Sequence, residues 1–343
     1  MRRWLSLALL ATLALGCRRE DPTPAPTRTA PRPAPKASAA PAPAEAPFRF
    51  PSAERIVAIG DVHGDLEATR RVLRLAGAID EEDDWIGGAL VVVQTGDQLD
   101  RGDDERAILD LFDRLRTRAP KAGGKFIALN GNHETMTVAG DFRYVTPGGF
   151  TAFDTVGASS GGDPRIARLP PRARGRAAAF FPGGEYARKL AEQDVAVVVG
   201  DSVFVHAGVL LAHVDYGIGR INAEVRAWMH GGDRDTPPRV IASDEAPVWT
   251  RLYGTPAPSP AACEELGKVL ERLGAKRMVV GHTVQENGIT SACDERVYRI
   301  DVGMARAYGS RPVEALEIRP DGVRVLREAG DGGARSPSPT GHP

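Results

Sequence analysis

Five short segments rich in aspartate and histidine constrain the fold of this chain most, because each of them follows a run of apolar residues. They are residues 60–65 (GDVHGD), 96–102 (GDQLDRG), 131–134 (GNHE), 205–208 (VHAG) and 281–283 (GHT). Their donor atoms are carboxylate and amide oxygens and imidazole nitrogens, without thiolates, which suits divalent metals of hard to borderline character. Since the segments are far apart in the sequence, their side chains can meet only if one fold brings five loops together.

The apolar runs alternate with helical patterns in the first half of the chain. Strands are expected over residues 55–59, 89–93 and 126–129. Residues 66–76 carry apolar side chains at helical spacing and stop at Gly77, and a second helix is expected after Asp103 or Asp104, either of which can cap it. This order predicts a parallel or mixed sheet covered by helices.

The second half contains further elements and one irregular insert. Strands are expected over residues 195–199, 203–205, 278–280, 296–300 and 313–318, and a helix over residues 261–273. Residues 140–191 are rich in glycine, proline and arginine and show no period, which predicts a lid or a substrate-binding insert. Within this insert, the arginine-rich run 165–176 predicts a solvated loop.

The polar segments can form a metal site, because ligand-binding residues of open α/β sheets lie just beyond the carboxyl ends of strands. Asp61 and His63 are two residues apart and can bind one ion, and the two oxygens of Asp97 can bridge to a second ion. The second ion can be completed by Asn132, His206 and His282. Two such ions lower the pKa of a bound water to about 7, so that hydroxide can attack phosphorus in line.

The motifs resemble those of the calcineurin-like metallophosphoesterase superfamily and, within it, the phosphoprotein phosphatase family, over about residues 55–308. The resemblance implies an α/β fold, a four-layer αββα sandwich in which helices flank two mixed sheets. It also implies a dinuclear metal centre, with manganese expected in assays and iron or zinc also suited to these ligands. The residues that match the family's metal ligands are Asp61, His63, Asp97, Asn132, His206 and His282.

The same resemblance assigns roles in catalysis and substrate binding. His133 matches the general acid and Asp100 the carboxylate that orients it, and a histidine held by an aspartate is a common proton donor near neutral pH. Arg101 and Arg251 match arginines that bind the phosphoryl oxygens, and Asn132 also matches a phosphate-binding residue. The implied enzyme is a metal-dependent phosphomonoesterase.

Three stretches favour one branch of the family. Residues 102–105, 277–285 and 300–304 are similar to the Shewanella-like protein phosphatases, and the Ser-Ala-Pro-Asn-Tyr signature of the eukaryotic serine/threonine phosphatases is absent. The expected substrate is a phosphorylated protein, with phosphotyrosine and phosphoserine or phosphothreonine both open. One alternative is a small phosphate ester: a nucleotide, a dinucleoside polyphosphate or a lipid-linked phosphate. A remote alternative is a non-catalytic, metal-stabilised lipoprotein that binds a partner.

The N-terminal residues predict export. Residues 1–17 have two arginines, an apolar stretch too short to span a bilayer, and small residues before Cys17, which resembles a lipoprotein signal with Cys17 as the lipidation site. Residues 18–50 predict a disordered linker rich in proline and alanine, residues 51–330 the metallophosphoesterase domain, and residues 331–343 a disordered tail. We therefore expect a protein anchored by its lipid in the bacterial cell envelope or periplasm, with a secreted soluble protein as the alternative.

Charge and cysteine content limit the partners. The formal net charge of −1 gives no reason to expect nucleic-acid binding, and membrane contact is expected only through the lipid anchor. Cys263 and Cys293 remain as an even pair, which an oxidising compartment allows to form a disulfide. Two buried thiols are the alternative at this point.

Overall fold

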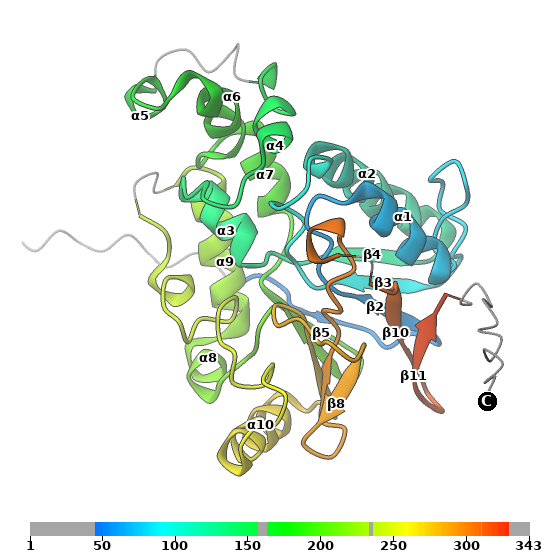
Figure 1. Ribbon diagram of the computed structural model, residues 1–343. Helices are drawn as coiled ribbons and strands as arrows, with labels where there is room; N and C mark the ends of the chain where they lie inside the picture. Colours follow the sequence, from blue (N-terminus) through cyan, green and yellow to red (C-terminus); the bar gives the residue numbers. More distant parts are fainter. Residues whose placement is uncertain (1–44, 157–162, 233–235, 310, 329–343) are drawn as a thin grey trace, which may run out of the picture. The chain divides into compact units, whose positions relative to one another are not determined.

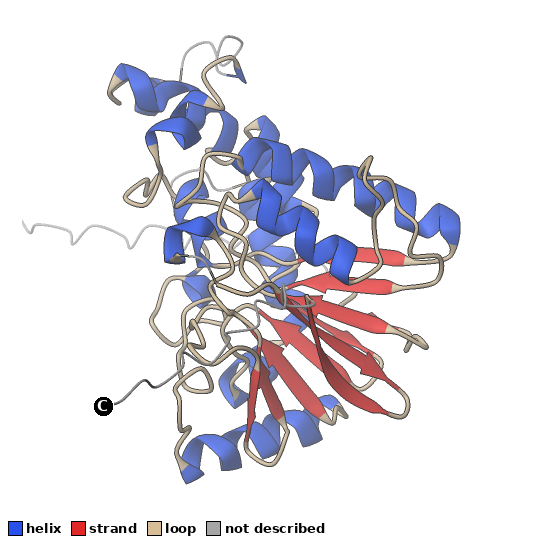
Figure 2. Cartoon of the chain, turned by 45° about the vertical axis from the view of Figure 1, so that its right-hand side comes forward, coloured by secondary structure: helices blue, strands red, loops and turns tan. Residues whose placement is uncertain are grey.

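The computed structural model describes residues 45–156, 163–232, 236–309 and 311–328. Within them, two mixed β-sheets lie between layers of helices (Figure 1, Figure 2). The predicted four-layer αββα fold is therefore confirmed.

The first sheet has five strands in the order β11-β10-β2-β3-β4. They are β2 (Ile56–Ile59), β3 (Val91–Gln94), β4 (Lys125–Ala128), β10 (Glu314–Arg319) and β11 (Gly322–Arg327). Strands β2, β3 and β4 run parallel, and their connections contain α1 (Leu66–Leu75) and α2 (Glu105–Arg118), whereas β10 pairs antiparallel with β2 and β11. The carboxyl ends of β2 and β3 therefore lie at the same edge of this sheet.

The second sheet has six strands in the order β1-β5-β6-β7-β9-β8. They are β1 (Arg49–Phe50), β5 (Ala196–Val199), β6 (Ser202–Val205), β7 (Arg277–Val280), β8 (Thr290–Ala292) and β9 (Val297–Arg299). Strands β6, β7 and β9 are parallel neighbours. The helices that follow β4 and the strands of this sheet include α3 (Asn132–Val138), α8 (Leu211–Tyr216), α9 (Ile218–Met229) and α10 (Pro260–Leu273).

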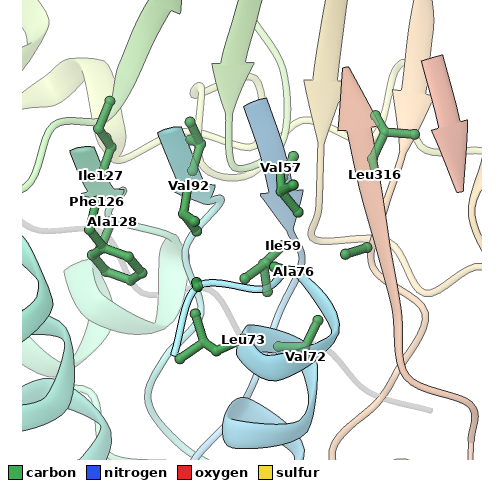
Figure 3. Packing of buried hydrophobic residues seen from close by; sticks show 14 of the residues in the cluster. Val57, Ile59, Val72, Leu73, Ala76, Val92, Phe126, Ile127, Ala128 and Leu316 are labelled. Carbon is green, nitrogen blue, oxygen red and sulfur yellow. The ribbon is translucent and has the colours of Figure 1, made fainter. Parts of the chain in front are cut away.

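Alternating side chains of the second sheet divide the apolar core into two clusters, because successive residues of a strand point to opposite faces. Phe204 of β6 and Val279 of β7 belong to a cluster that also contains residues of the first sheet. Val205 and Val280 belong instead to a cluster with residues of α9 and α10. Figure 3 shows part of the first cluster, where Val72 of α1 and its neighbours pack near the strands. Each sheet is thereby fixed on both faces.

The predicted strands and helices correspond closely to observed ones. Gly77 adopts a left-handed φ of 66° directly after α1, as expected for a glycine that ends a helix. Asp104 is the N-cap residue of α2, although its side chain makes no capping hydrogen bond. Strands β1, β8 and β11 were not predicted. Strands β1 and β8 have two and three residues, too few to show alternation, and β11 contains only exposed and half-buried residues.

The insert 140–191 is not an irregular loop. It contains α4 (Pro147–Thr151), α5 (Pro164–Ala167), α6 (Pro171–Phe180) and α7 (Glu185–Ala191). Three of these helices begin at a proline, which suits the first helical turn but reads in the sequence as a helix breaker. The prediction of a solvated loop over 165–176 is wrong as well, since Arg176 in α6 has no exposed surface.

The N-terminal boundary of the domain also differs from the prediction. Residues 45–50, assigned to the linker, are part of the fold: Ala46 is buried, its N–H donates to the carbonyl of Gly219, and β1 pairs with β5. The signal segment with Cys17, the linker to residue 44 and the predicted tail 331–343 lie outside the described residues. Among the described residues, no helix has both the length and the apolar character needed to cross a bilayer.

The two cysteines of the domain are joined. Cys263 in α10 and Cys293 after β8 form a disulfide, with their Cα atoms 5.2 Å apart. Of the two alternatives left open by the sequence, the structure therefore contains the bridge. It connects α10 to the β8–β9 hairpin across 30 residues of sequence.

Candidate active site

The predicted metal ligands lie together at the carboxyl ends of strands from both sheets. Asp61 and His63 follow β2, and Asp97 follows β3. Asn132 opens α3 after β4, whereas His206 follows β6 and His282 follows β7. All six side chains are buried.

The first group of donor atoms surrounds Nε2 of His63. This nitrogen lies 3.9 Å from Oδ2 of Asp61 and 3.7 Å from Oδ2 of Asp97. Nδ1 of His63 is 3.0 Å from the carbonyl oxygen of Leu99 and can only donate to it, so Nε2 carries a lone pair directed at the two carboxylates. Burial lowers the pKa of His63 to about 3, which keeps the ring neutral.

The second group surrounds Nε2 of His206. This nitrogen lies 3.2 Å from Oδ1 of Asp97, 3.0 Å from Oδ1 of Asn132 and 3.1 Å from Nδ1 of His282. Nδ1 of His206 faces the carbonyl of Thr95 at 2.9 Å, so its proton lies on the opposite side of the ring from this group.

His282 adds a further acceptor atom to the second group. Its Nε2 faces the carbonyl of Trp249 at 3.0 Å, and burial lowers the pKa of the ring to about 3. Nδ1 of His282 therefore also carries a lone pair. When the ring protons of His206 and His282 lie on the nitrogens that face backbone carbonyls, four acceptor atoms face one another, an arrangement that a divalent cation satisfies.

The loops that carry these ligands have unusual backbone conformations. His63, Asp97 and His282 have φ values of 40°, 56° and 66°, and Asp100 and Arg101 have φ values of 66° and 68°. Non-glycine residues rarely adopt positive φ, and such residues cluster at functional sites, where the surrounding structure holds them.

His133 and Asp100 form a buried pair beside Asp97. Nδ1 of His133 lies 2.5 Å from Oδ2 of Asp100, and its Nε2 lies 3.8 Å from Oδ2 of Asp97. Burial alone would lower the pKa of His133, but the charge of Asp97 and the hydrogen bond to Asp100 raise it above its ordinary value. The ring can therefore hold a proton at neutral pH and present it from Nε2.

The two predicted arginines contact different residues of the site. Arg101 is 3.3 Å from Nε2 of His133 through Nη2, and its guanidinium carbon lies 4.8 Å and 5.5 Å from the ring centres of Tyr144 and Tyr308. Its Nε has no partner among the described residues. Arg251 is exposed and donates through Nη1 to the carbonyl of His282 at 3.3 Å. Both guanidinium groups are therefore next to the residues of the two metal groups.

Comparison with known proteins identifies the family. The family model described as calcineurin-like phosphoesterase matches residues 54–286. The chain is 41% identical over 308 residues to Shewanella-like protein phosphatase 2 of Arabidopsis thaliana, covering 81% of this chain and 78% of that protein. It is 30% identical over 283 residues to Shewanella-like protein phosphatase 1 of Plasmodium berghei, covering 80% and 74%. The chain belongs to the calcineurin-like phosphoesterases.

Solved structures support the same fold. The chain superposes with a TM-score of 0.64 on a cold-active protein-tyrosine phosphatase of a psychrophilic Shewanella species, at 23% identity and 82% coverage of both chains. It superposes with a TM-score of 0.51 on a protein serine/threonine phosphatase of Saccharomyces cerevisiae, at 14% identity and coverage of 83% and 84%. At these identities the likeness concerns the fold alone. As a calcineurin-like phosphoesterase, the chain is a metal-binding hydrolase.

The phosphoesterase site also contains residues whose roles the sequence did not reveal. Glu134 accepts hydrogen bonds from the backbone N–H groups of Asp97, Gln98, Leu99 and Gly131, and so ties the loop after β3 to the loop after β4. The GNHE motif contains this glutamate, but the sequence does not distinguish a metal ligand from a residue that holds two loops together.

Asp301 and Tyr308 come from the segment after β9, which also borders the phosphoesterase site. Burial raises the pKa of Asp301, which lies against Asp61, to about 6. The hydroxyl of Tyr308 lies 3.2 Å from Nε2 of His63. Residues 300–304 indicated the branch of the family but gave no reason to place this loop against the ligands.

Proposed function

We propose that this phosphoesterase is a dinuclear-metal phosphatase that removes phosphoryl groups from phosphorylated proteins. The observation that carries the proposal is the position of Asp97, whose two oxygens lie 3.7 Å from His63 and 3.2 Å from His206. A carboxylate between two groups of acceptor atoms is suited to bridge two ions. The names of the relatives as protein phosphatases support a protein substrate.

We assign six residues to the two ions, Asp61, His63 and Asp97 to one and Asp97, Asn132, His206 and His282 to the other. When bound, the ions would supply a nucleophilic water at neutral pH and neutralise the phosphoryl oxygens. His133 lies within reach of a metal at the first group, with His63 and Asp97. We assign it to proton transfer instead, because Asp100 holds one ring nitrogen and the cationic Arg101 lies beside the other.

The chain's own residues then divide the work of hydrolysis. His133 donates the proton on Nε2 to the leaving oxygen, and Asp100 keeps the ring oriented and balances its charge. Arg101 and Arg251 donate to the phosphoryl oxygens, for which the guanidinium fork has a suitable geometry, and Asn132 contacts the same group. The exposed ring of Tyr144 beside Arg101 supports phosphotyrosine over phosphoserine, because it adds aromatic surface next to the phosphate position.

The test is a substrate panel with the full-length protein. Phosphotyrosine, phosphoserine and phosphothreonine peptides are assayed beside nucleotides, dinucleoside polyphosphates and sugar phosphates, with added Mn²⁺ and with chelator. We expect turnover of phosphopeptides that the chelator abolishes. Turnover of the small molecules alone would overturn the protein-phosphatase assignment, and activity that survives full removal of metal would overturn the metal assignment.

We also propose that the protein is exported and anchored through a lipid on Cys17. The N-terminal sequence supports this, and so does the disulfide between Cys263 and Cys293, since disulfides persist mainly in oxidising compartments. Cell fractionation of the wild type and Cys17→Ser tests it. The wild type should be found with the membrane and the variant should not, and equal membrane fractions would contradict the anchor.

A further inference from the structure

Arg176 of α6 is a charged residue without exposed surface that reaches the catalytic pair. Its Nη2 donates to Oδ1 of Asp100 at 3.2 Å, while Oδ2 of the same carboxylate lies 2.5 Å from Nδ1 of His133. The insert 140–191 therefore takes part in the candidate site. It contributes a side chain that contacts the partner of the proposed general acid.

The guanidinium of Arg176 is bound on several sides. Nη2 also donates to Oε1 of Glu105 and to Oγ1 of Thr137, each at 3.2 Å, and Nη1 donates to the carbonyl of Gly149 at 3.1 Å. Nη1 forms a further ion pair with Glu105. These contacts fix the orientation of the guanidinium, which in turn fixes the carboxylate of Asp100.

The surroundings of Arg176 show that its charge is needed there. Phe153 and Phe180 place their ring centres 5.5 Å and 5.0 Å from the guanidinium carbon. Asp100 and Glu105 are both fully buried, and Oε1 of Glu105 accepts the N–H of Asp100 at 2.5 Å. Two buried carboxylates so close together require a cation, and Arg176 contacts both of them.

We propose that Arg176 is a positioning residue for proton transfer, which holds the Asp100 carboxylate so that Oδ2 faces His133 and thereby couples α6 to protonation of the leaving group. This inference rests on the proposed function, in which His133 is the general acid. Arg176 itself gives up no proton and contacts no substrate atom.

The chemical step defines what the residue can influence. A water oxygen forms the new bond to phosphorus and loses a proton to bulk water, while the bond from phosphorus to the leaving oxygen breaks and its electron pair stays on that oxygen. The proton on Nε2 of His133 passes to the leaving oxygen, and His133 afterwards regains a proton from bulk water. This transfer matters most when the conjugate acid of the leaving group is weak. A change in the orientation of Asp100 should therefore slow hydrolysis of esters with poor leaving groups more than of esters with good ones.

The experiment compares phenyl phosphate, whose phenoxide is a poor leaving group, with p-nitrophenyl phosphate, whose nitrophenoxide is a good one. Loss of the Arg176 guanidinium alone removes the cation that two buried carboxylates share and threatens folding. The main variant is therefore the double replacement Glu105→Gln with Arg176→Met, which removes one charge of each sign. We expect kcat on phenyl phosphate to fall about 10- to 100-fold and kcat on p-nitrophenyl phosphate less than about threefold, with KM nearly unchanged.

Arg176→Lys and Arg55→Met are the comparison variants. Arg176→Lys keeps the charge and should recover part of the kcat on phenyl phosphate. Arg55 binds the buried carboxylate of Glu317 at the end of β2 remote from Asp61, so Arg55→Met tests the effect of a weakened buried ion pair. Arg55→Met should change kcat on both substrates by the same factor. Metal content is measured for every variant and should stay constant.

His133→Asn separates failure of this inference from failure of the proposed function. If His133→Asn lowers kcat on both phosphates by the same factor, His133 is not the general acid, and the roles of both His133 and Arg176 are overturned. If His133→Asn discriminates but the double variant affects both substrates equally or neither, only the role of Arg176 is overturned. Adding the double replacement to His133→Asn should change kcat less than about threefold, because residues that act through one another are not additive.

Discussion

The backbone N–H of His282 donates to the carboxylate of Asp61 at 3.2 Å, across 221 residues of sequence. Asp61 follows β2 of the first sheet and His282 follows β7 of the second. A proposed ligand of one ion thus orients the loop that carries a ligand of the other ion.

Asp61→Asn should therefore affect both ions. The amide has only one acceptor oxygen, so the variant cannot bind a metal and accept the N–H of His282 as a carboxylate does. We expect metal content to fall below that of the wild type and phosphatase activity to fall more than about 100-fold. Elemental analysis of the purified protein measures the first, and Asp84→Asn, at an exposed site, is the control.

His133→Asn should reduce activity on phosphopeptides by about 10²–10⁴, the usual contribution of a general acid. Metal content should remain that of the wild type, because His133 is not among the residues assigned to the ions. Loss of metal together with activity would make His133 a ligand instead, as its distance of 3.8 Å from Asp97 would permit.

Arg251→Ala should weaken substrate binding more than it slows catalysis. Arg251 is exposed and donates to the carbonyl of His282 and to the hydroxyl of Thr283. We expect KM to rise about 10-fold with a smaller change in kcat, as for a group that binds ground state and transition state alike. A KM equal to that of the wild type would remove Arg251 from the site.

Glu317→Gln should destabilise the fold in a manner that depends on pH. Burial opposes ionisation of Glu317, but hydrogen bonds from Arg55 and Arg324 lower its pKa to about 2, against about 4.3 in an unfolded chain. The stabilisation is thus complete above about pH 5 and is lost as the pH falls toward 2. Urea unfolding should show a cost of about 1–3 kcal/mol at pH 7 that shrinks at pH 3. A cost independent of pH would contradict this.

Cys263→Ser should lower stability without changing the active site. The disulfide closes a loop of 30 residues between α10 and the β8–β9 hairpin, and bridges of this kind contribute about 2–4 kcal/mol. Thermal unfolding without reductant should show a lower Tm for the variant than for the wild type. With reductant the two proteins should unfold at similar temperatures, and an unchanged difference would mean that the serine itself is responsible.

The sequence predicted the fold, and it predicted which side chains meet at the strand ends, because the signals were local. A strand end followed by an aspartate or histidine can be recognised within a few residues, and this was enough for Asp61, Asp97 and His282. Arg176 could not be found this way, since its role depends on the packing of α6 against Asp100, 76 residues away. In the sequence it was one arginine in a charged run, and only burial distinguishes it from its neighbours.

The division of the ligands between two sheets has a consequence for how activity arises. A chain in which only the first sheet has formed lacks His206 and His282, and one in which only the second has formed has no other proposed ligand than these two. Such a partly assembled chain cannot hydrolyse anything, however native its local structure. Catalytic activity therefore indicates that the whole domain has folded, and a newly synthesised chain stays inactive until its two sheets have packed together.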